Sequence, residues 1–236
     1  MIKVEKLTIK NIPAILWGDK SSKLIIAVHG KCASKIDNSI WILAEEAVQL
    51  GYQVLSFDLP QHGERVYETE PCMVQNCVKE LGFVMEYAKQ QAEEIYLFAN
   101  SMGAYFSLLS YKDERIKHTW FLSPVVNMLA IIQSMMSQMD ITEEQLREKG
   151  VIDHPMEPLY WEYYCYVKEH PILKWQSPTS ILRGEYDTLC EYSVVSEFAK
   201  QFECTLEEQK GGEHWFHTAE QLAYYRKWLQ AELKNQ

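Results

Sequence analysis

The chain has 236 residues, 47% of them hydrophobic and 24% charged. It is therefore long enough to bury a core as one large α/β domain or two small ones. The formal net charge of −10 argues against a nucleic-acid partner, because binding a phosphate backbone requires basic patches. No apolar run approaches the roughly 18 residues of a membrane span, so we expect no membrane partner.

The first ten residues and the cysteines indicate the cellular compartment in which the protein is expected. MIKVEKLTIK mixes charged and apolar residues and lacks the apolar core of a signal peptide. The cysteines form no CxxC pair and show no metal-ligand spacing; they are Cys32, Cys72, Cys77, Cys165, Cys190 and Cys204. We therefore expect a cytoplasmic protein with free thiols and no metal site.

The order of elements predicts the fold class. No linker, low-complexity tract or repeat interrupts the chain, so residues 1–236 are expected to form a single domain. Residues 2–17 indicate two short strands joined by a turn at Asn11–Pro13. Further strands are expected at Leu24–Val28, Gln53–Phe57, Ile95–Ala99, Thr119–Leu122, Thr179–Arg183 and Cys204–Glu207. Helices are expected at Ser39–Leu50, between Cys72 and Gln91, from Ser101, at Glu191–Phe202 and from Thr218. This alternation predicts a mostly parallel α/β sheet of about eight strands with helices on both faces.

Residues 127–176 interrupt the alternation before the strand Thr179–Arg183 and are rich in Met and aromatic residues. Thr142 and Gln145 suit a helix capping box, and Gly150 suits the end of that helix. Leu159–Val167 fits a strand at least as well as a helix, because its apolar residues alternate. Two interpretations stand for the whole segment: a cap or lid over the C-terminal edge of the sheet, or additional core packing.

A serine follows directly on the strand Ile95–Ala99, in the stretch LFANSMGAYF. Ala99 and Gly103 lie two residues to either side of Ser101, as a tight crossing from strand to helix requires. Such a crossing projects the Ser101 hydroxyl beyond the strand end and points the Met102 N–H at the same space. The alternatives are a serine that caps the helix or a hydroxyl in the core.

A serine nucleophile requires a base that a third group orients. Asp187, in LRGEYDTLCE, follows the strand Thr179–Arg183, and His214, in GGEHWFHTAE, lies in a Gly-rich loop before the last helix. Both are expected at the edge of the sheet where Ser101 lies. Taken singly, Asp187 also suits a turn and His214 an ordinary loop. Glu185 and His217 are the competing acid and base.

An oxyanion formed at the serine needs two amide donors. Met102 N–H is the first candidate. The stretch AVHGKCAS supplies the second, because Gly30 allows a sharp turn that presents the Lys31 N–H, with Cys32 as the fallback.

Several stretches in this order resemble the α/β-hydrolase superfamily over nearly the whole chain. They are VHGK, FDLPQHGER, FANSMGAY, LRGEYDTL and GGEHWFHT. The sequence looks most similar to the small bacterial carboxylesterase and serine-aminopeptidase-like branch. The resemblance implies an α/β-hydrolase fold in which Ser101 is the nucleophile, His214 the base and Asp187 the orienting acid. It also implies Lys31 and Met102 as oxyanion donors. Ala99 departs from the commonest pattern, which has Gly at this position.

The activity that follows is a serine hydrolase that cleaves a small-molecule carboxylic ester through an acyl-enzyme, without metal or cofactor. Amides, peptides and thioesters are alternative substrates of the same three residues. A ligand-binding protein on a hydrolase scaffold is the alternative from another class. Asp58 and His62 are expected to structure their loop, and Cys32 has no base to make it a nucleophile.

Overall fold

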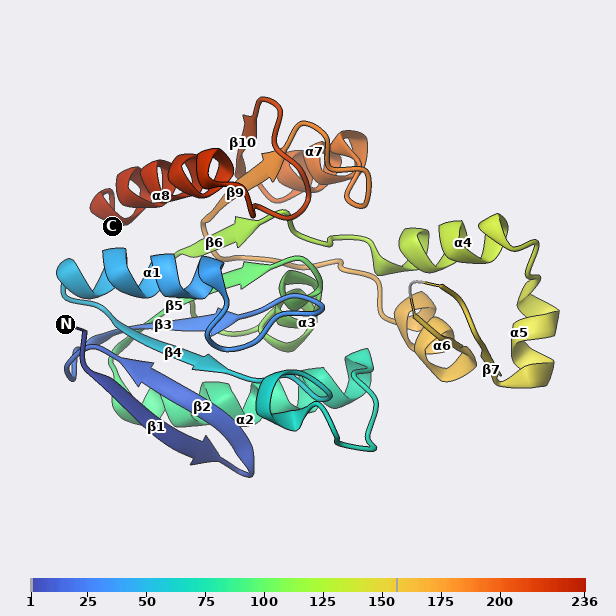
Figure 1. Cartoon of the computed structure of the whole chain (residues 1–236), viewed down its shortest axis with the longest axis horizontal. Coiled ribbons are helices and arrows are strands. Elements are labelled where there is room, and N and C mark those ends of the chain that lie inside the picture. The colour runs from blue at the N-terminus through green and yellow to red at the C-terminus, as the bar shows by residue number, and fades with distance from the viewer. Residues whose placement is uncertain (1, 156) are drawn as a thin grey trace.

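A sheet of eight strands forms the centre of the molecule (Figure 1). Its strands are β1 (Val4–Ile9), β2 (Ile12–Trp17), β3 (Lys23–Val28), β4 (Gln53–Phe57), β5 (Glu94–Asn100), β6 (Thr119–Leu122), β9 (Thr179–Gly184) and β10 (Thr205–Gln209). The computed structural model describes residues 2–155 and 157–236. The strand order is β1-β2-β4-β3-β5-β6-β9-β10, and β2 runs antiparallel to both its neighbours while all other pairs are parallel. The expected mostly parallel sheet is confirmed.

Helices cover both faces of this sheet, as expected. One face carries α1 (Asn38–Gln49) and α8 (Ala219–Lys234), and the other carries α2 (Val74–Gln91), α3 (Met102–Ser110) and α7 (Tyr192–Gln201). Successive residues of a strand point to opposite faces. In β3, Ile25 and Ala27 accordingly pack under α1 and α8. Leu24, Ile26 and Val28 pack on the opposite side. The continuous apolar run of β3 therefore follows from burial on both faces.

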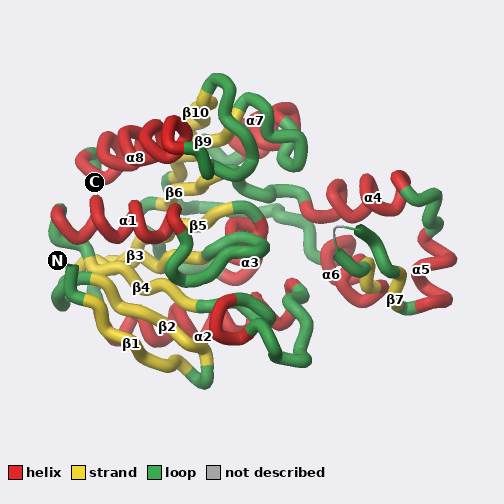
Figure 2. Tube along the Cα trace, in the orientation of Figure 1, coloured by secondary structure: helices red, strands yellow, loops and turns green. Residues whose placement is uncertain are grey.

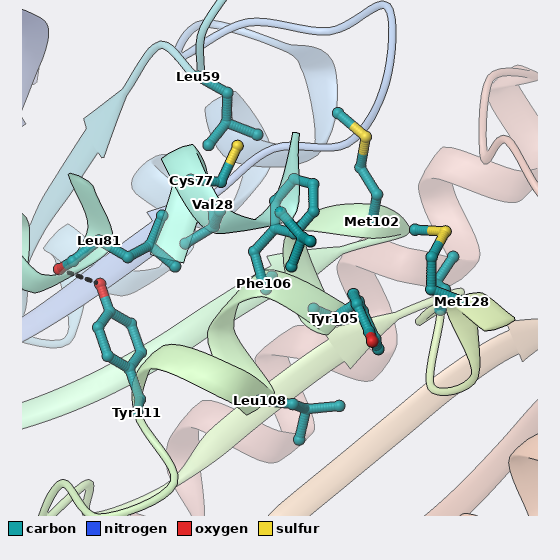
Figure 3. Packing of buried hydrophobic residues seen from close by; sticks show 14 of the residues in the cluster. Val28, Leu59, Cys77, Leu81, Met102, Tyr105, Phe106, Leu108, Tyr111 and Met128 are labelled. Atoms are coloured by element: carbon teal, nitrogen blue, oxygen red, sulfur yellow. Dashed lines mark hydrogen bonds between the residues drawn. The ribbon is translucent and has the colours of Figure 1, made fainter. Parts of the chain in front are cut away.

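The cluster between α2, α3 and the sheet fixes the helix that follows Ser101. Figure 3 shows Phe106 and Leu108 of α3 in this cluster, together with Leu81 of α2. At the end of α3, the buried Tyr111 hydroxyl donates a hydrogen bond of 3.0 Å to the Leu81 carbonyl. These contacts hold α3 against α2 at one end and leave its N-terminus at the edge of the sheet.

The first hairpin corrects one sequence expectation. The turn lies at Lys10 and Asn11, with φ of 49° and 75°, and Pro13 lies inside β2, opposite Thr8. The turn predicted at Asn11–Pro13 is therefore wrong in position. A two-residue turn whose central residues both have positive φ matches the twist of the strands it joins, and Asn adopts this backbone readily.

The segment between β6 and β9 carries its own elements. They are α4 (Met128–Gln138), α5 (Glu143–Lys149), β7 (Val151–Ile152), β8 (Leu159–Tyr160) and α6 (Trp161–Glu169); residue 156 lies outside the described residues. Thr142 and Gln145 form the expected capping box at the start of α5, and Gly150 ends it with φ of 72°. Of the two interpretations of 159–167, the helix is observed from Trp161 onward.

The burial pattern explains why 159–167 is mainly helical. Tyr163, Tyr164 and Val167 are its buried helical residues, a spacing that places all three on one face of a helix. A strand would have buried alternate residues instead.

The segment lies beyond the edge at which the parallel strands end, and two loop stretches connect it to the sheet (Figures 1 and 2). In the described part of the chain, no helix combines the length and hydrophobicity that crossing a membrane requires.

Candidate active site

Ser101 occupies a strained turn between β5 and α3. Its backbone has φ of 49° and ψ of −126°, a conformation that costs about 1–3 kcal/mol in a residue other than glycine. The surrounding structure holds it there: the Ser101 N–H donates to the Leu122 carbonyl at 3.1 Å, and the Ser101 carbonyl accepts from the Val125 N–H at 3.0 Å. The hydroxyl makes no capping bond to α3. The helix-cap alternative is therefore wrong.

The Ser101 hydroxyl meets His214 instead. Its Oγ lies 2.9 Å from His214 Nε2, and His214 Nδ1 lies 2.8 Å from Asp187 Oδ2. The Asp187 side chain is fully buried, whereas 12% of the His214 side chain is exposed. A carboxylate only accepts, so Nδ1 carries the imidazole proton and Nε2 accepts from the serine hydroxyl.

Backbone amides orient the Asp187 carboxylate. Its Oδ1 accepts from the N–H of Leu189 at 3.0 Å and from that of Cys190 at 2.8 Å. With Oδ1 held in this way, Oδ2 faces His214. Charged acceptors make strong hydrogen bonds with backbone amides, so the orientation of the carboxylate is fixed before any substrate binds.

The loops that carry the acid and the base touch each other. The Tyr186 N–H donates to the Gly212 carbonyl at 2.7 Å. A Cβ at Gly184 would lie 2.4 Å from the Gly212 carbonyl carbon, closer than side chains ever approach. Only glycine at Gly184 permits this approach, which brings Asp187 and His214 to one place.

Arg183 supports the loop that carries Asp187, a role that the sequence pattern did not indicate. Its buried guanidinium donates from Nη2 to the carbonyls of Asp187 at 3.0 Å and Cys190 at 3.2 Å. It also forms an ion pair with Glu208. The sequence does place the cation of Arg183 at the end of a buried strand, directly before Gly184. A buried cation needs polar partners, so this position could have indicated its contacts.

The competing acid and base lie outside the hydrogen-bonded chain. The carboxylate of Glu185 accepts from the Gly211 N–H at 2.7 Å. The ring of His217 lies 2.7 Å from the Trp215 carbonyl and 3.4 Å from the Glu213 carboxylate. The structure thus brings Ser101, His214 and Asp187 together and places Glu185 and His217 elsewhere.

Asp58 structures the loop after β4, as expected. It is fully buried and accepts from the backbone N–H groups of Lys35 at 2.9 Å and Glu64 at 3.0 Å. The Lys35 ammonium pairs with the same carboxylate. Asp58 therefore joins the loop after β4 to the loop after β3.

The sequence pattern gave no indication of a role for His29 either. Burial lowers its pKa to about 4, so the imidazole is neutral at pH 7. Nε2 accepts from the Leu59 N–H at 3.0 Å, which leaves Nδ1–H to donate to the Gly30 carbonyl at 2.7 Å. His29 thereby fixes the loop that carries Lys31. The ring of His62 lies against it, 5.1 Å between centroids.

The two predicted oxyanion donors lie on elements that meet at Ser101. Met102 is the first residue of α3, where a helix leaves its N–H groups unpaired, and its amide has no acceptor among the described residues. A Cβ at Gly30 would lie 2.9 Å from the Ser101 Cβ, so the loop of Lys31 passes directly over the serine. Cys32, the fallback donor, has φ of 58°.

Comparison with solved structures decides the fold. No family model and no curated protein matches this sequence. Est1E from Butyrivibrio proteoclasticus with ferulic acid bound superposes with a TM-score of 0.82, at 20% identity over 98% of each chain. A putative hydrolase from Agrobacterium vitis S4 gives 0.81 at 15% identity over 99% of each chain. Mouse alpha/beta hydrolase domain-containing protein 10 gives 0.80 at 13% identity, again over 99% of each chain.

The chain has the α/β-hydrolase fold. Within this fold, Ser101 occupies the turn between β5 and α3, Asp187 follows β9, and His214 lies between β10 and α8. All three lie just after the C-terminal ends of parallel strands, where ligands bind in open α/β sheets.

The turn at Ser101 in this α/β-hydrolase fold depends on Gly103. A Cβ at Gly103 would lie 2.5 Å from the His29 carbonyl oxygen and 2.8 Å from that of Val28. Because both are backbone atoms, we expect Gly103→Ala to lower the free energy of unfolding by about 1–3 kcal/mol, measured by urea denaturation.

Gly82→Ala is the matched control. Gly82 lies inside α2 and a Cβ there meets nothing within 4 Å, so this substitution should leave stability unchanged or raise it by up to about 1 kcal/mol. Equal stability of the two variants would contradict the close packing of α3 on β3.

Proposed function

We propose that the chain is a serine hydrolase that cleaves carboxylic esters of small molecules through an acyl-enzyme. The observation that carries this proposal is the unbroken set of hydrogen bonds from the Ser101 hydroxyl through His214 to the buried Asp187. A serine hydroxyl is a weak nucleophile until a base accepts its proton. Here His214 Nε2 lies within hydrogen-bond distance of the Ser101 hydroxyl, and His214 Nδ1 is hydrogen-bonded to the Asp187 carboxylate.

Each residue has one role in the proposed reaction. Ser101 Oγ attacks the ester carbonyl carbon while His214 Nε2 takes its proton, and Asp187 stabilises the imidazolium that forms. His214 then donates this proton to the leaving alkoxide, which leaves an acyl group on Ser101. Water, activated by His214 in the same way, then attacks the acyl-enzyme and releases the carboxylic acid.

The N–H groups of Met102 and Lys31 are the proposed donors to the oxyanion. The Met102 amide stands at the N-terminus of α3, where the helix dipole favours negative charge. The Lys31 amide lies in the loop that His29 holds against Ser101. One such donor contributes about 3–4 kcal/mol to stabilising the transition state.

The space beside His214 suits a substrate with an apolar group. A cavity of about 760 Å³ lies between α4 and α7 and includes His214 in its lining. Its apolar lining includes Val126, Ile131, Met135, Leu189 and Val194. Met is adaptable in shape, which fits an acyl or aryl group of small to medium size. One structure of similar fold, Est1E, holds ferulic acid, a carboxylic acid.

Residues 127–176 form the cap in this proposal. The segment supplies α4 to the wall of the cavity. It also reaches the loop over Ser101, because Glu157 forms an ion pair with Lys31. A cap in contact with this loop excludes water from the bound ester and strengthens the electrostatic interactions there.

Two measurements test the proposal. We expect the wild-type chain to hydrolyse p-nitrophenyl esters of short or medium acyl length and to react covalently with a fluorophosphonate probe. Labelling should disappear in Ser101→Ala and persist in Ser110→Ala, since Ser110 lies at the far end of α3 and its hydroxyl donates to the Val78 carbonyl. A folded wild-type chain that neither labels nor hydrolyses would favour a ligand-binding protein. Faster cleavage of aryl amides than of esters would favour an amidase.

A further inference from the structure

Two cysteines meet at the start of α2, outside the hydrogen bonds of the active site. Cys72 Sγ and Cys77 Sγ lie 3.6 Å apart, and neither is in a disulfide. Cys77 is fully buried, in the same cluster as Val28 and Leu59 (Figure 3). Cys72 is half-buried. Cys72 is therefore the more accessible residue of the pair.

The geometry of the helix start explains why these sulfurs touch. Met73 is the N-cap of α2, so Cys72 is the residue before the cap and Cys77 the fourth residue of the helix. Side chains at these two positions pack together in a hydrophobic staple. The Cys77 N–H donates to the Met73 carbonyl at 3.0 Å, which fixes the first turn. Most staples join two apolar side chains, whereas this one joins two thiols.

The surroundings give the two thiols different properties. A hydrogen bond from the Cys77 thiol lowers the pKa of Cys72; burial and the Glu157 carboxylate oppose this shift, and the nearby His62 adds to it. Burial and the neighbouring Cys72 raise the pKa of Cys77. The surroundings therefore favour the thiolate at Cys72 and the protonated thiol at Cys77. The N-terminus of α2 further favours negative charge at Cys72.

His62 faces the pair from the loop after β4. Burial lowers the pKa of His62, but the hydrogen bond with Cys72 raises it, and the net shift is upward. The imidazolium of His62 and the thiolate of Cys72 therefore stabilise each other's charges. The opposite side of the His62 ring is fixed, because its Nδ1 lies 2.8 Å from the Pro60 carbonyl. Neither Cys72, Cys77 nor His62 has a role in the proposed ester hydrolysis.

We propose that Cys72 and Cys77 are a redox pair, in which Cys72 reacts first with a peroxide and Cys77 then closes a disulfide. The Cys72 thiolate attacks one oxygen of hydrogen peroxide and the O–O bond breaks. The attacked oxygen keeps its proton, which gives a sulfenic acid, and the other oxygen leaves with the bonding electron pair as a hydroxide ion that is released to the solvent. The Cys77 sulfur then attacks the Cys72 sulfur. The S–O bond breaks and water leaves with the Cys77 proton. A dithiol reductant reverses the oxidation.

The spacing of the pair suits this second step. A disulfide requires the sulfurs to approach to about 2.0 Å, whereas the two Sγ atoms lie 3.6 Å apart, so they must move closer before the bond forms. Cys72 is the less buried residue of the pair, so we expect its side chain to make this movement.

Mass spectrometry of the whole chain tests the redox pair. The reduced protein is treated with hydrogen peroxide, alkylated with iodoacetamide and digested with trypsin. Both cysteines lie in the single peptide Val66–Lys79, since Arg65 and Lys79 flank them. We expect this peptide to lose two hydrogens and carry no alkyl group, while peptides with Cys32 and Cys165 remain alkylated. Alkylation of both Cys72 and Cys77 after peroxide treatment would overturn the proposal.

Variants separate the two roles in the folded protein. In Cys77→Ser, Cys72 should stop at the sulfenic acid and react with dimedone. In Cys72→Ser, the buried Cys77 should stay reduced. The alkylation rate of Cys72 should reach half its maximum at a pH well below the value of about 8.5 for an ordinary thiol, and His62→Gln should move this midpoint upward. A midpoint near 8.5 in the wild-type chain, or equal oxidation of Cys77 in Cys72→Ser, would contradict the proposed order of reaction.

Discussion

Replacing Ser101 with alanine is expected to lower kcat for ester hydrolysis by about 10⁴- to 10⁶-fold. The substitution removes the atom that forms the acyl-enzyme, so His214 has no hydroxyl to activate and only water remains as nucleophile. The remaining rate comes from the oxyanion donors and from binding. Steady-state kinetics on the best p-nitrophenyl ester measures the loss. A variant with more than a tenth of wild-type activity would show that another residue is the nucleophile.

Stability measurements on the same position separate loss of chemistry from loss of fold. Ser101 has φ of 49°, which any side chain with a Cβ finds costly and glycine does not. We therefore expect Ser101→Gly to be as inactive as Ser101→Ala and yet more stable than the wild-type chain. This combination identifies a strained turn that is kept for its hydroxyl.

Strands buried on both faces could be predicted from the sequence, because a short, continuous apolar run between polar stretches is too short for a buried helix. Leu24–Val28 and Thr119–Leu122 are short apolar runs between polar stretches, and the structure places β3 and β6 there. The helix α6 could not be assigned, because Leu159–Val167 is short and carries apolar residues at both periods. Packing of Tyr163, Tyr164 and Val167 on one side decides its conformation, and this is tertiary information.

The residues of the candidate site could be predicted for a different reason. Parallel strands end at one edge of a sheet, so positions just after β5 and β9, and in the loop after β10, are brought together by topology alone. His29 and Arg183 were missed because their roles depend on partners far along the chain. His29 accepts from Leu59, and Arg183 donates to Asp187 and Cys190. No local pattern specifies such contacts.

Replacing Asp187 with asparagine is expected to lower kcat by about 10⁴-fold, because it changes which nitrogen of His214 carries the proton. The N–H groups of Leu189 and Cys190 donate to the oxygen at the Oδ1 position, so the amide oxygen of asparagine must take that place. The amide NH₂ group then faces His214 Nδ1 at the position where Oδ2 lies 2.8 Å away. A donor there forces the imidazole proton onto Nε2, which can no longer accept from Ser101.

Glu185→Gln is the matched control, because it makes the same chemical change two residues earlier on the same loop. Glu185 is exposed, and its carboxylate bonds only to the Gly211 N–H among the described contacts, so the kcat of Glu185→Gln should stay within about threefold of wild type. The pH profile of Asp187→Asn adds a second readout: hydroxide can replace the missing base, so the loss should shrink above pH 9. If Asp187→Asn retained nearly full activity while Glu185→Gln lost it, the acid would be Glu185, and the backbone bonds to Asp187 would serve only to shape the loop.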